Sequence, residues 1–198
     1  AFRSALHELG VGPGDRVGIV ANNRVEWAVA AYASYGLGSS FVPMYEVQSP
    51  SEWRFILADC GAKVVLGSGE RIVQALEGIR ALTPTLEHVI GIERPSDTPG
   101  SYRALLDRGK SAPVASLRPE RNAVADFVYT SGTTGEPKGV LLSHANLISN
   151  IAATMAVFPI VPEDRSLSFL PWAHAYGQVT ELHMILSVGA STALNDDL

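Results

Sequence analysis

Apolar positions along the first hundred residues follow two alternating spacings. Short, nearly continuous apolar runs, typical of strands buried on both faces, occupy 16–21, 40–45, 63–67 and 88–92. Between these runs apolar residues recur every three or four positions, as on one face of a helix, beginning near residues 2, 25, 50, 72 and 102. Strands that alternate with helices predict βαβ units with right-handed crossovers and a mostly parallel sheet, which is an α/β fold.

Helix caps and inward faces can be predicted for three of the helices. Ser49 and Glu52, with Pro50 between them, form the pattern of a capping box. Asn22 or Asn23 is expected to cap the helix that follows, and its inward face is predicted to carry Val25, Ala28, Val29 and Tyr32. Ser143 is expected to cap a later helix with Leu147, Ile148, Ile151, Ala152 and Met155 inward.

The chain divides into two parts by composition. Residues 111–122 are polar and rich in proline and serine, and we interpret them as a linker. Residues 1–110 would then form an α/β subdomain, and 123–198 a second part of the same domain. In the second part the pattern predicts strand, glycine-rich loop and strand, then a helix, a strand at 166–170, a helix at 176–186 and a strand at 190–194.

The glycine-rich loop carries the clearest chemical signal. Residues 129–139 hold three glycines, four Ser or Thr residues and one lysine, Lys138. Glycines allow close approach of the backbone to a ligand, and successive N–H groups form a nest for anions. Hydroxyl donors and a mobile positive charge complete a set suited to a polyphosphate. A hairpin that binds no ligand is the plain alternative.

Two better-known motifs do not fit this loop. A Walker loop has Gly-Lys-Ser/Thr opening a helix, whereas Lys138 lies between Pro137 and Gly139 and precedes a strand. A nucleophile elbow has glycine two positions before the serine, and here Tyr129 stands before Ser131.

Three stretches resemble the adenylate-forming superfamily, which includes acyl-CoA synthetases, firefly luciferases and the adenylation domains of peptide synthetases. Residues 129–139 with 142–147 resemble its signature motif, and 169–177 (Phe-Leu-Pro-Trp-Ala-His-Ala-Tyr-Gly) its next motif in the form seen in acyl-CoA synthetases. Residues 9–43 resemble the start of the large N-terminal domain. The resemblance implies ATP-dependent activation of a carboxylic acid to an acyl-adenylate with release of pyrophosphate, then transfer to coenzyme A with release of AMP.

The same resemblance implies roles for individual residues. Lys138 and His174 are the expected catalytic residues, and Trp172, His174 and Tyr176 are expected to bind the acid. The ATP phosphates are expected on Thr130, Ser131, Gly132, Thr133, Thr134, Gly135 and Lys138. Mg²⁺ is an expected cofactor, but its ligands are expected after Leu198, so no metal ligand is assigned here.

Each assignment has a plain alternative. Lys138 could be a solvated surface lysine, His174 a residue packed at a helix entrance, and Trp172 part of the core. Gln178 and Glu181 lie one helical turn apart and receive no role.

Composition narrows the class of protein. A net charge of −5 over 198 residues argues against nucleic acid as a partner. The single cysteine, Cys60, indicates a reducing compartment, so we expect a cytoplasmic protein. No apolar run is long enough to span a bilayer. Peripheral membrane contact and oligomeric state stay open.

The chain lacks an initial methionine and ends directly after a strand-like run. We therefore expect an N-terminal-domain fragment of an acyl-CoA synthetase for medium- or long-chain fatty acids, inactive alone. Two alternatives remain open, namely an adenylation domain of a peptide or polyketide assembly line and a non-catalytic polyphosphate- or nucleotide-binding domain.

Overall fold

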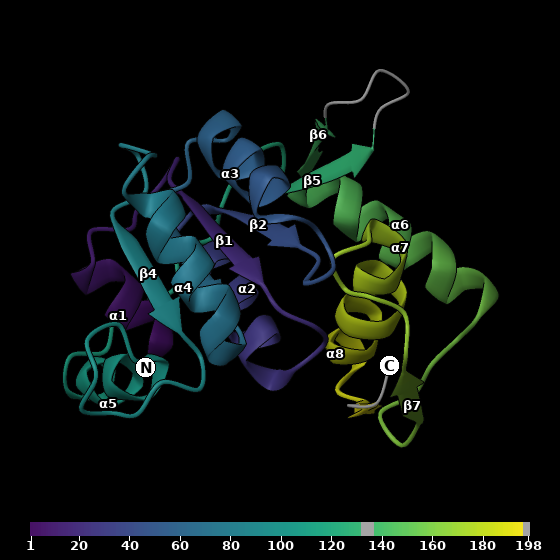
Figure 1. The fold of residues 1–198 in the computed structure, drawn as a ribbon. Helices are drawn as coiled ribbons and strands as arrows, with labels where there is room; N and C mark the ends of the chain where they lie inside the picture. Colours follow the sequence, from purple (N-terminus) through teal and green to yellow (C-terminus); the bar gives the residue numbers. More distant parts are fainter. Residues whose placement is uncertain (132–136, 196–198) are drawn as a thin grey trace.

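A computed structural model describes residues 1–131 and 137–195 and contains two sheets (Figure 1). The larger sheet has the strand order β4-β3-β1-β2-β5-β6, and β1 to β5 run parallel while β6 runs antiparallel to β5. Its strands are β1 (Arg16–Val20), β2 (Ser40–Met44), β3 (Val64–Gly67), β4 (His88–Gly91), β5 (Val124–Ser131) and β6 (Pro137–Ser143). The smaller sheet pairs β7 (Arg165–Ser168) with β8 (Ser191–Leu194) in parallel. The predicted α/β fold with a mostly parallel sheet is confirmed.

Helices cover both faces of the large sheet. In Figure 1, α3 and α4 lie in front of it. The helices are α1 (Phe2–Glu8), α2 (Val25–Tyr35), α3 (Pro50–Asp59), α4 (Gly69–Arg80), α5 (Tyr102–Ser111) and α6 (His144–Val157), followed by α7 (Ala175–Gly177), the π-helical turn η1 (Gln178–His183) and α8 (Met184–Val188). No helix within the described parts of the chain has both the length and the apolar character needed to cross a membrane.

Two apolar cores lie on opposite faces of the sheet. Val64 and Leu66 of β3 pack in the core formed with α1, α2 and α5. Val65, between them, packs in the core formed with α3 and α4. Because successive side chains of a strand point to opposite faces, burial of both faces requires an apolar residue at nearly every position. This explains why the strands appeared in the sequence as continuous apolar runs.

Both predicted serine caps are present. Ser49 caps α3, since its Oγ accepts from the N–H of Glu52 (3.3 Å) while its own N–H donates to the Glu52 carboxylate (2.8 Å). Ser143 caps α6 by the same exchange with Asn146. These local signals were sufficient because both partners of each bond lie within four residues.

The inward faces predicted for α2 and α6 are wrong. In α2 the buried side chains include Trp27, Ala30 and Ala31, whereas Val25 is 66% exposed. Arg24, not Asn22 or Asn23, is the N-cap residue, and no side chain caps the helix. Trp27 decides the orientation, because its large ring packs against Phe41 and Trp172 in the core.

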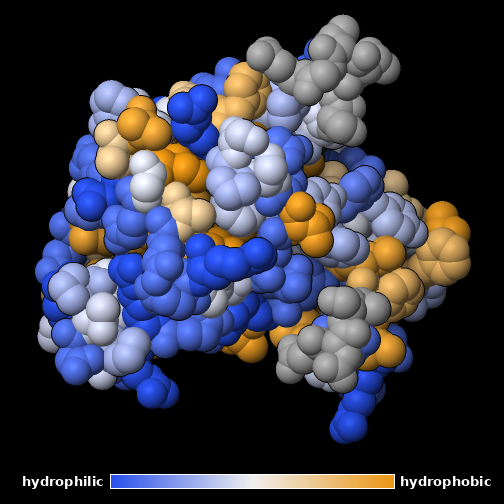
Figure 2. Space-filling view, viewed as in Figure 1, coloured by the Kyte–Doolittle hydropathy of each residue, from blue (hydrophilic) through white to orange (hydrophobic). Residues whose placement is uncertain are grey.

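In α6 only Leu147 of the expected inward residues is buried, and Ile148 is half exposed. The helix contacts β6 and η1 along one edge, and the rest of it faces outward. Figure 2 shows apolar side chains gathered at the right of the view, over the C-terminal end of α6, where Val157 and Phe158 are exposed.

The predicted linker has no helix or strand after Ser111 until β5. It is fixed to α1 at Val114, whose carbonyl accepts two hydrogen bonds from the Arg3 guanidinium (2.7 and 3.0 Å) and whose N–H donates to Ser4 (3.0 Å). Beyond it, β5 pairs with β2, so the strands on both sides of the linker share one sheet. The proposed subdomain boundaries themselves stay a prediction.

Close packing of α1 on α5 gives a stability prediction. A Cβ at Gly109 would lie 2.1 Å from the Ala1 carbonyl oxygen and 2.9 Å from the Ala5 nitrogen. Gly109→Ala should therefore force the helices apart and lower the free energy of unfolding by about 1–3 kcal/mol. Gly78→Ala is the matched control, because nothing lies within 4 Å of that helical position. It should raise stability by about 0.5–1 kcal/mol. Urea titration measures both, and equal effects of the two substitutions would contradict this packing.

Candidate functional site

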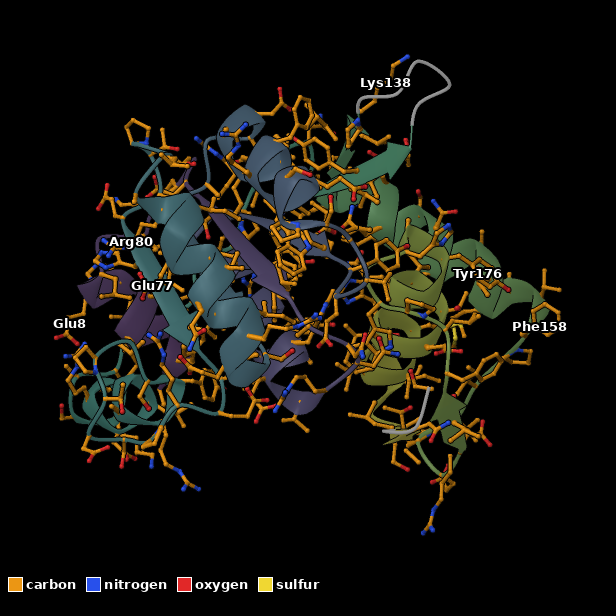
Figure 3. All side chains as sticks on the ribbon, in the orientation of Figure 1. Glu8, Glu77, Arg80, Lys138, Phe158 and Tyr176 are labelled. Atoms are coloured by element: carbon orange, nitrogen blue, oxygen red, sulfur yellow. The ribbon has the colours of Figure 1, made fainter. Side chains whose placement is uncertain are left out.

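The predicted phosphate loop lies at the end of an antiparallel hairpin. Its strands β5 and β6 confirm the predicted strand–loop–strand arrangement, and the last cross-strand pairs are Thr130 with Lys138 and Ser131 with Pro137. Directly opposed residues lie on the same face of the pair, so Thr130 and Lys138 are neighbours. Lys138 is exposed and projects from the hairpin end in Figure 3. Gly132, Thr133, Thr134 and Gly135 lie outside the described residues.

The base of the hairpin is anchored by Tyr129. Its hydroxyl donates to Asp59 at the end of α3 (2.5 Å), and its ring crosses Gly139, where a Cβ would lie 3.0 Å from a ring carbon. Burial, and then the hydrogen bond to Asp59, raise the pKa of Tyr129 well above its ordinary value, so the hydroxyl stays protonated as the donor. Gly139 is therefore needed for close packing at this point.

The segment that carries His174 connects β7 to α7. His174 begins α7, and its Nδ1 accepts from the N–H of Tyr176 (3.2 Å), so the helix-entrance role considered from the sequence is present. The His174 ring is nevertheless exposed, as is Tyr176, which points outward between α7 and α6 in Figure 3. The ring is thus held through Nδ1, while the rest of it is exposed and can contact a ligand.

Trp172 lies on the inner side of the same segment. It is 2% exposed, packs edge-on against Trp27 (ring centroids 5.6 Å apart) and donates from Nε1 to Ser168 Oγ (2.9 Å). In the described structure it anchors the segment to the core. Contact between Trp172 and an acid substrate stays a prediction.

Two cavities border the His174 segment and the helix that follows it. One has a volume of about 760 Å³ and lies at the carboxyl ends of β1 and β2, where the chain leaves β1 toward one face of the sheet and β2 toward the other. Its lining includes Asn22, Arg24, Glu46, Phe169 and Ala173. Such points of divergence at the carboxyl ends of parallel strands are the usual ligand sites of open α/β sheets. The other is a groove of about 470 Å³ between α2, α6 and α8, lined by Tyr32, Tyr35, His144, Leu147, Ile148, Ile151, His183, Leu186 and Ser187.

Comparison with known proteins identifies the family. Residues 1–197 match the family model described as "AMP-binding enzyme". The chain belongs to this family of adenylate-forming enzymes. The peroxisomal long chain acyl-CoA synthetase 6 of Arabidopsis thaliana is 32% identical over 92% of this chain and 27% of its own. The "3-[(3aS,4S,7aS)-7a-methyl-1,5-dioxo-octahydro-1H-inden-4-yl]propanoyl:CoA ligase" of Mycobacterium tuberculosis is 33% identical over 95% of this chain and 38% of its own.

A solved structure supports the same assignment. ATP-bound MatB of Rhodopseudomonas palustris superposes with a TM-score of 0.80 at 26% identity, over 98% of this chain and 38% of that one. The chain thus spans between 27% and 38% of the length of these three proteins. Its sheet is that of the N-terminal domain of adenylate-forming enzymes.

A buried polar cluster joins strand β5 of the hairpin to η1, the helical turn that follows α7. Asp126 of β5 accepts from the Tyr35 hydroxyl (2.7 Å) and from Gln178 Nε2 (3.1 Å), and Gln178 also donates to Tyr35 (3.2 Å). Burial raises the pKa of Asp126 to about 7, although both hydrogen bonds act in the opposite direction. Sequence reasoning missed this cluster. An acidic residue inside the apolar run Val124–Tyr129 was its one visible signal.

Two histidines face the groove beside this cluster. His183 Nδ1 lies 3.0 Å from the Tyr32 hydroxyl. Burial, and then the nearby His144, lower the pKa of His183 to about 4, and burial also lowers the pKa of His144. Both rings are therefore neutral at pH 7, and the groove presents an uncharged aromatic and aliphatic surface.

Asp126 gives a prediction for the pH dependence of stability. The pKa of an unfolded aspartate is about 3.9, so between pH 4 and 7 the folded protein binds a proton that the unfolded chain releases. The free energy of unfolding should therefore fall as pH rises through this interval. Asp126→Asn removes the group that titrates. If the Gln178 amide rotates, its carboxamide can form a hydrogen bond with the carboxamide of the new asparagine. From pH 5 to 8 the wild type should lose on the order of 2 kcal/mol relative to Asp126→Asn in urea titrations. The titration of His183 is common to both proteins and cancels in this comparison. Stability curves that run parallel over this pH range would therefore contradict a raised pKa of Asp126.

Proposed function

We propose that the protein containing this chain is an ATP-dependent acyl-CoA ligase. A carboxylate oxygen attacks the α-phosphorus of ATP, pyrophosphate leaves, and the acyl-adenylate forms. The thiol of coenzyme A then attacks the acyl carbon and AMP leaves. The observation that carries this proposal is the hairpin, which places Lys138 opposite Thr130 at the mouth of a glycine- and hydroxyl-rich loop in a chain of the AMP-binding family.

Charge neutralisation is the chemistry that this hairpin supports. The attack brings a carboxylate toward a polyanion, so catalysis depends on cations and N–H donors at the phosphates and on holding the reacting groups in line. Lys138 supplies the cation within the described part of the site. Mg²⁺ and coenzyme A belong to the proposal on family grounds. Among residues 1–131 and 137–195 no three His, Cys, Asp or Glu side chains group in a way that could hold a metal ion.

Lys138→Ala tests the phosphate role in the protein expressed from its complete gene. A hydrogen bond to a charged group is worth about 1.5–3 kcal/mol, so turnover or ATP affinity should fall roughly 10- to 150-fold with the fold intact. Pyrophosphate release from ATP and a panel of carboxylic acids measures the effect. Lys110→Ala is the control, because Lys110 is an exposed lysine of α5 paired with Asp107 (2.7 Å), and it should leave the kinetics unchanged. Equal kinetics in both variants would make Lys138 a solvated surface residue.

The same assay separates the remaining alternatives. Pyrophosphate release without formation of an acyl-CoA thioester would favour an adenylation domain that loads a carrier protein. ATP binding without carboxylate-dependent pyrophosphate release would favour a non-catalytic nucleotide-binding domain.

We further propose that the groove between α2, α6 and α8 receives the tail of the acid. His183 of η1 and Leu186 of α8 line it, and both elements follow α7, which His174 begins. A carboxylate near His174 can therefore extend its tail along these consecutive helical elements. The volume lies within the usual range for small-molecule sites. The relatives' names include a long-chain acyl-CoA synthetase and a ligase for a bicyclic dioxo-propanoyl group, so tail chemistry differs within the family. The neutral lining favours an apolar tail, as in a medium- or long-chain fatty acid.

Ile148→Trp tests the tail groove. Ile148 is half exposed at the groove wall, and an indole there should exclude the last part of a long tail. Excluding two or three methylenes costs about 1.6–2.4 kcal/mol, so kcat/KM for long tails should fall about 15- to 60-fold while short acids are unaffected. Ala153→Trp adds the same ring to an exposed position of α6 that does not line the groove. A chain-length profile that is equal for the two variants would place the tail elsewhere.

A further inference from the structure

The turn that precedes His174 is held by a single carboxylate oxygen. Glu181 Oε2 accepts three hydrogen bonds, from Ser168 Oγ (2.7 Å) and from the backbone N–H groups of Phe169 and Leu170 (both 3.0 Å). Glu181 is 7% exposed and lies in η1, which directly follows α7. The carboxylate therefore closes a loop from the end of β7, through the turn, to the helix after it.

Asn23, from a separate segment, holds the same turn. Its Oδ1 accepts from the N–H of Trp172 (2.8 Å), and its Nδ2 donates to the carbonyl of Leu170 (2.8 Å) and to Ser168 Oγ (3.1 Å). Asn23 belongs to the segment between β1 and α2, which borders the 760 Å³ cavity. Side chains from two separate elements thus converge on Ser168, whose hydroxyl also accepts from the Trp172 indole (2.9 Å).

These bonds replace the backbone pairing that a helix or strand would supply. Residues 169–174 lie outside helices and strands, and buried N–H groups need partners. Here the partners of Phe169, Leu170 and Trp172 are side-chain oxygens of Glu181 and Asn23. The path of residues 169–172 is therefore fixed by two polar side chains, and the His174 ring, which accepts from the N–H of Tyr176, lies at the end of this path.

The π-helical turn makes this arrangement specific. A π turn contains one residue more than an α-helical turn, and such turns are frequent at functional sites. In η1, Gln178 is directed to Asp126 and Tyr35, while Glu181 is directed to the His174 turn. Gln178 and Glu181, from one turn, thereby reach strand β5 and the turn after β7.

We propose that Glu181 and Asn23 are positioning residues for carboxylate activation, which hold the His174 ring at the reacting carboxylate. The inference rests on the proposed function. Neither residue touches the reacting atoms. Their effect on rate passes through the turn, because misplacing a site group by about 1 Å can cost on the order of 100-fold in rate.

Glu181→Ala, Glu181→Gln and Asn23→Ala test the proposal in the protein expressed from its complete gene. Glu181→Ala should lower kcat about 10- to 100-fold per folded molecule, with KM for ATP within about twofold of the wild type. Glu181→Gln keeps an oxygen where the three donors converge, so it should restore kcat to within about fivefold. Asn23→Ala should lower kcat in the same direction. If Glu181→Ala fails to fold, Glu181→Gln and Asn23→Ala still give the comparison.

Ser40→Ala is the matched control for stability alone. Ser40 is buried in β2, and its hydroxyl donates to the Val124 carbonyl (2.7 Å), away from the turn. This variant should lower the melting temperature while kcat per folded molecule is unchanged. Glu181→Ala with lowered stability but wild-type kcat would overturn the proposal.

The NMR signal of the His174 ring gives a readout that does not depend on turnover. The His174 signal is assigned as the one that disappears in the His174→Gln variant. The signal of His88 serves as the reference for chemical shift and line width. In Glu181→Ala and Asn23→Ala the His174 signal should shift or broaden, while in Ser40→Ala it should match the wild type. An unchanged His174 signal in both turn variants would overturn the positioning role. A wild type that releases no pyrophosphate with any acid would count against the proposed function and leave this readout intact.

Discussion

Burial of both faces of the parallel sheet is the constraint on which the rest of the structure depends. Successive side chains of each strand pack into two separate apolar cores, so helices must cover both faces of the sheet. The chain meets this requirement by sending α2 behind the sheet after β1 and α3 in front of it after β2. The divergence of these two connections leaves the 760 Å³ cavity at the carboxyl ends of the strands. The 760 Å³ cavity, which Phe169 and Ala173 border, is therefore a consequence of how the sheet is covered.

Polar as well as apolar side chains join the second part of the chain to this sheet. Trp172 packs on Trp27, and Leu147 and Leu182 belong to the same core. Around it, Asn23 binds the β7 turn, and Asp126 and Tyr35 bind Gln178. A buried hydrogen bond adds only about 1 kcal/mol of net stability, but an unpaired buried group costs about 1–3 kcal/mol. Such a junction gains mainly in specificity, because an arrangement that separates these pairs leaves buried polar groups without partners.

The candidate site combines a hairpin and a turn with different supports. The hairpin is exposed at Lys138 and anchored at its base through Tyr129 and Asp59. The His174 turn is fixed from inside and open on its outer side. Asp126 lies four residues before Thr130 in β5 and binds the helix after His174, so one buried strand supports both parts. The proposed reaction, in which a polyphosphate and a carboxylate approach each other, relies on this arrangement.

The sequence alone determined the features whose causes are local. Two-sided burial made the strands visible as apolar runs, capping serines marked two helix starts, and glycines with hydroxyl residues marked the β5–β6 hairpin. The family motifs then directed attention to Lys138 and His174. All of these signals lie within a few residues of the structure that they specify.

The tertiary structure decided what depends on distant partners. Helix α2 is apolar nearly all round, so its periodicity could not choose a buried face, and packing of Trp27 against Phe41 and Trp172 did. Asn23 is a residue type and position typical of a helix N-cap, but its side chain instead accepts from the N–H of Trp172, 149 residues away. The sequence predicted no role for Gln178, because its hydrogen-bond partner Tyr35 lies 143 residues away along the chain. A polar residue's chemistry can be seen in the sequence, whereas the group that satisfies it is chosen only when the chain folds.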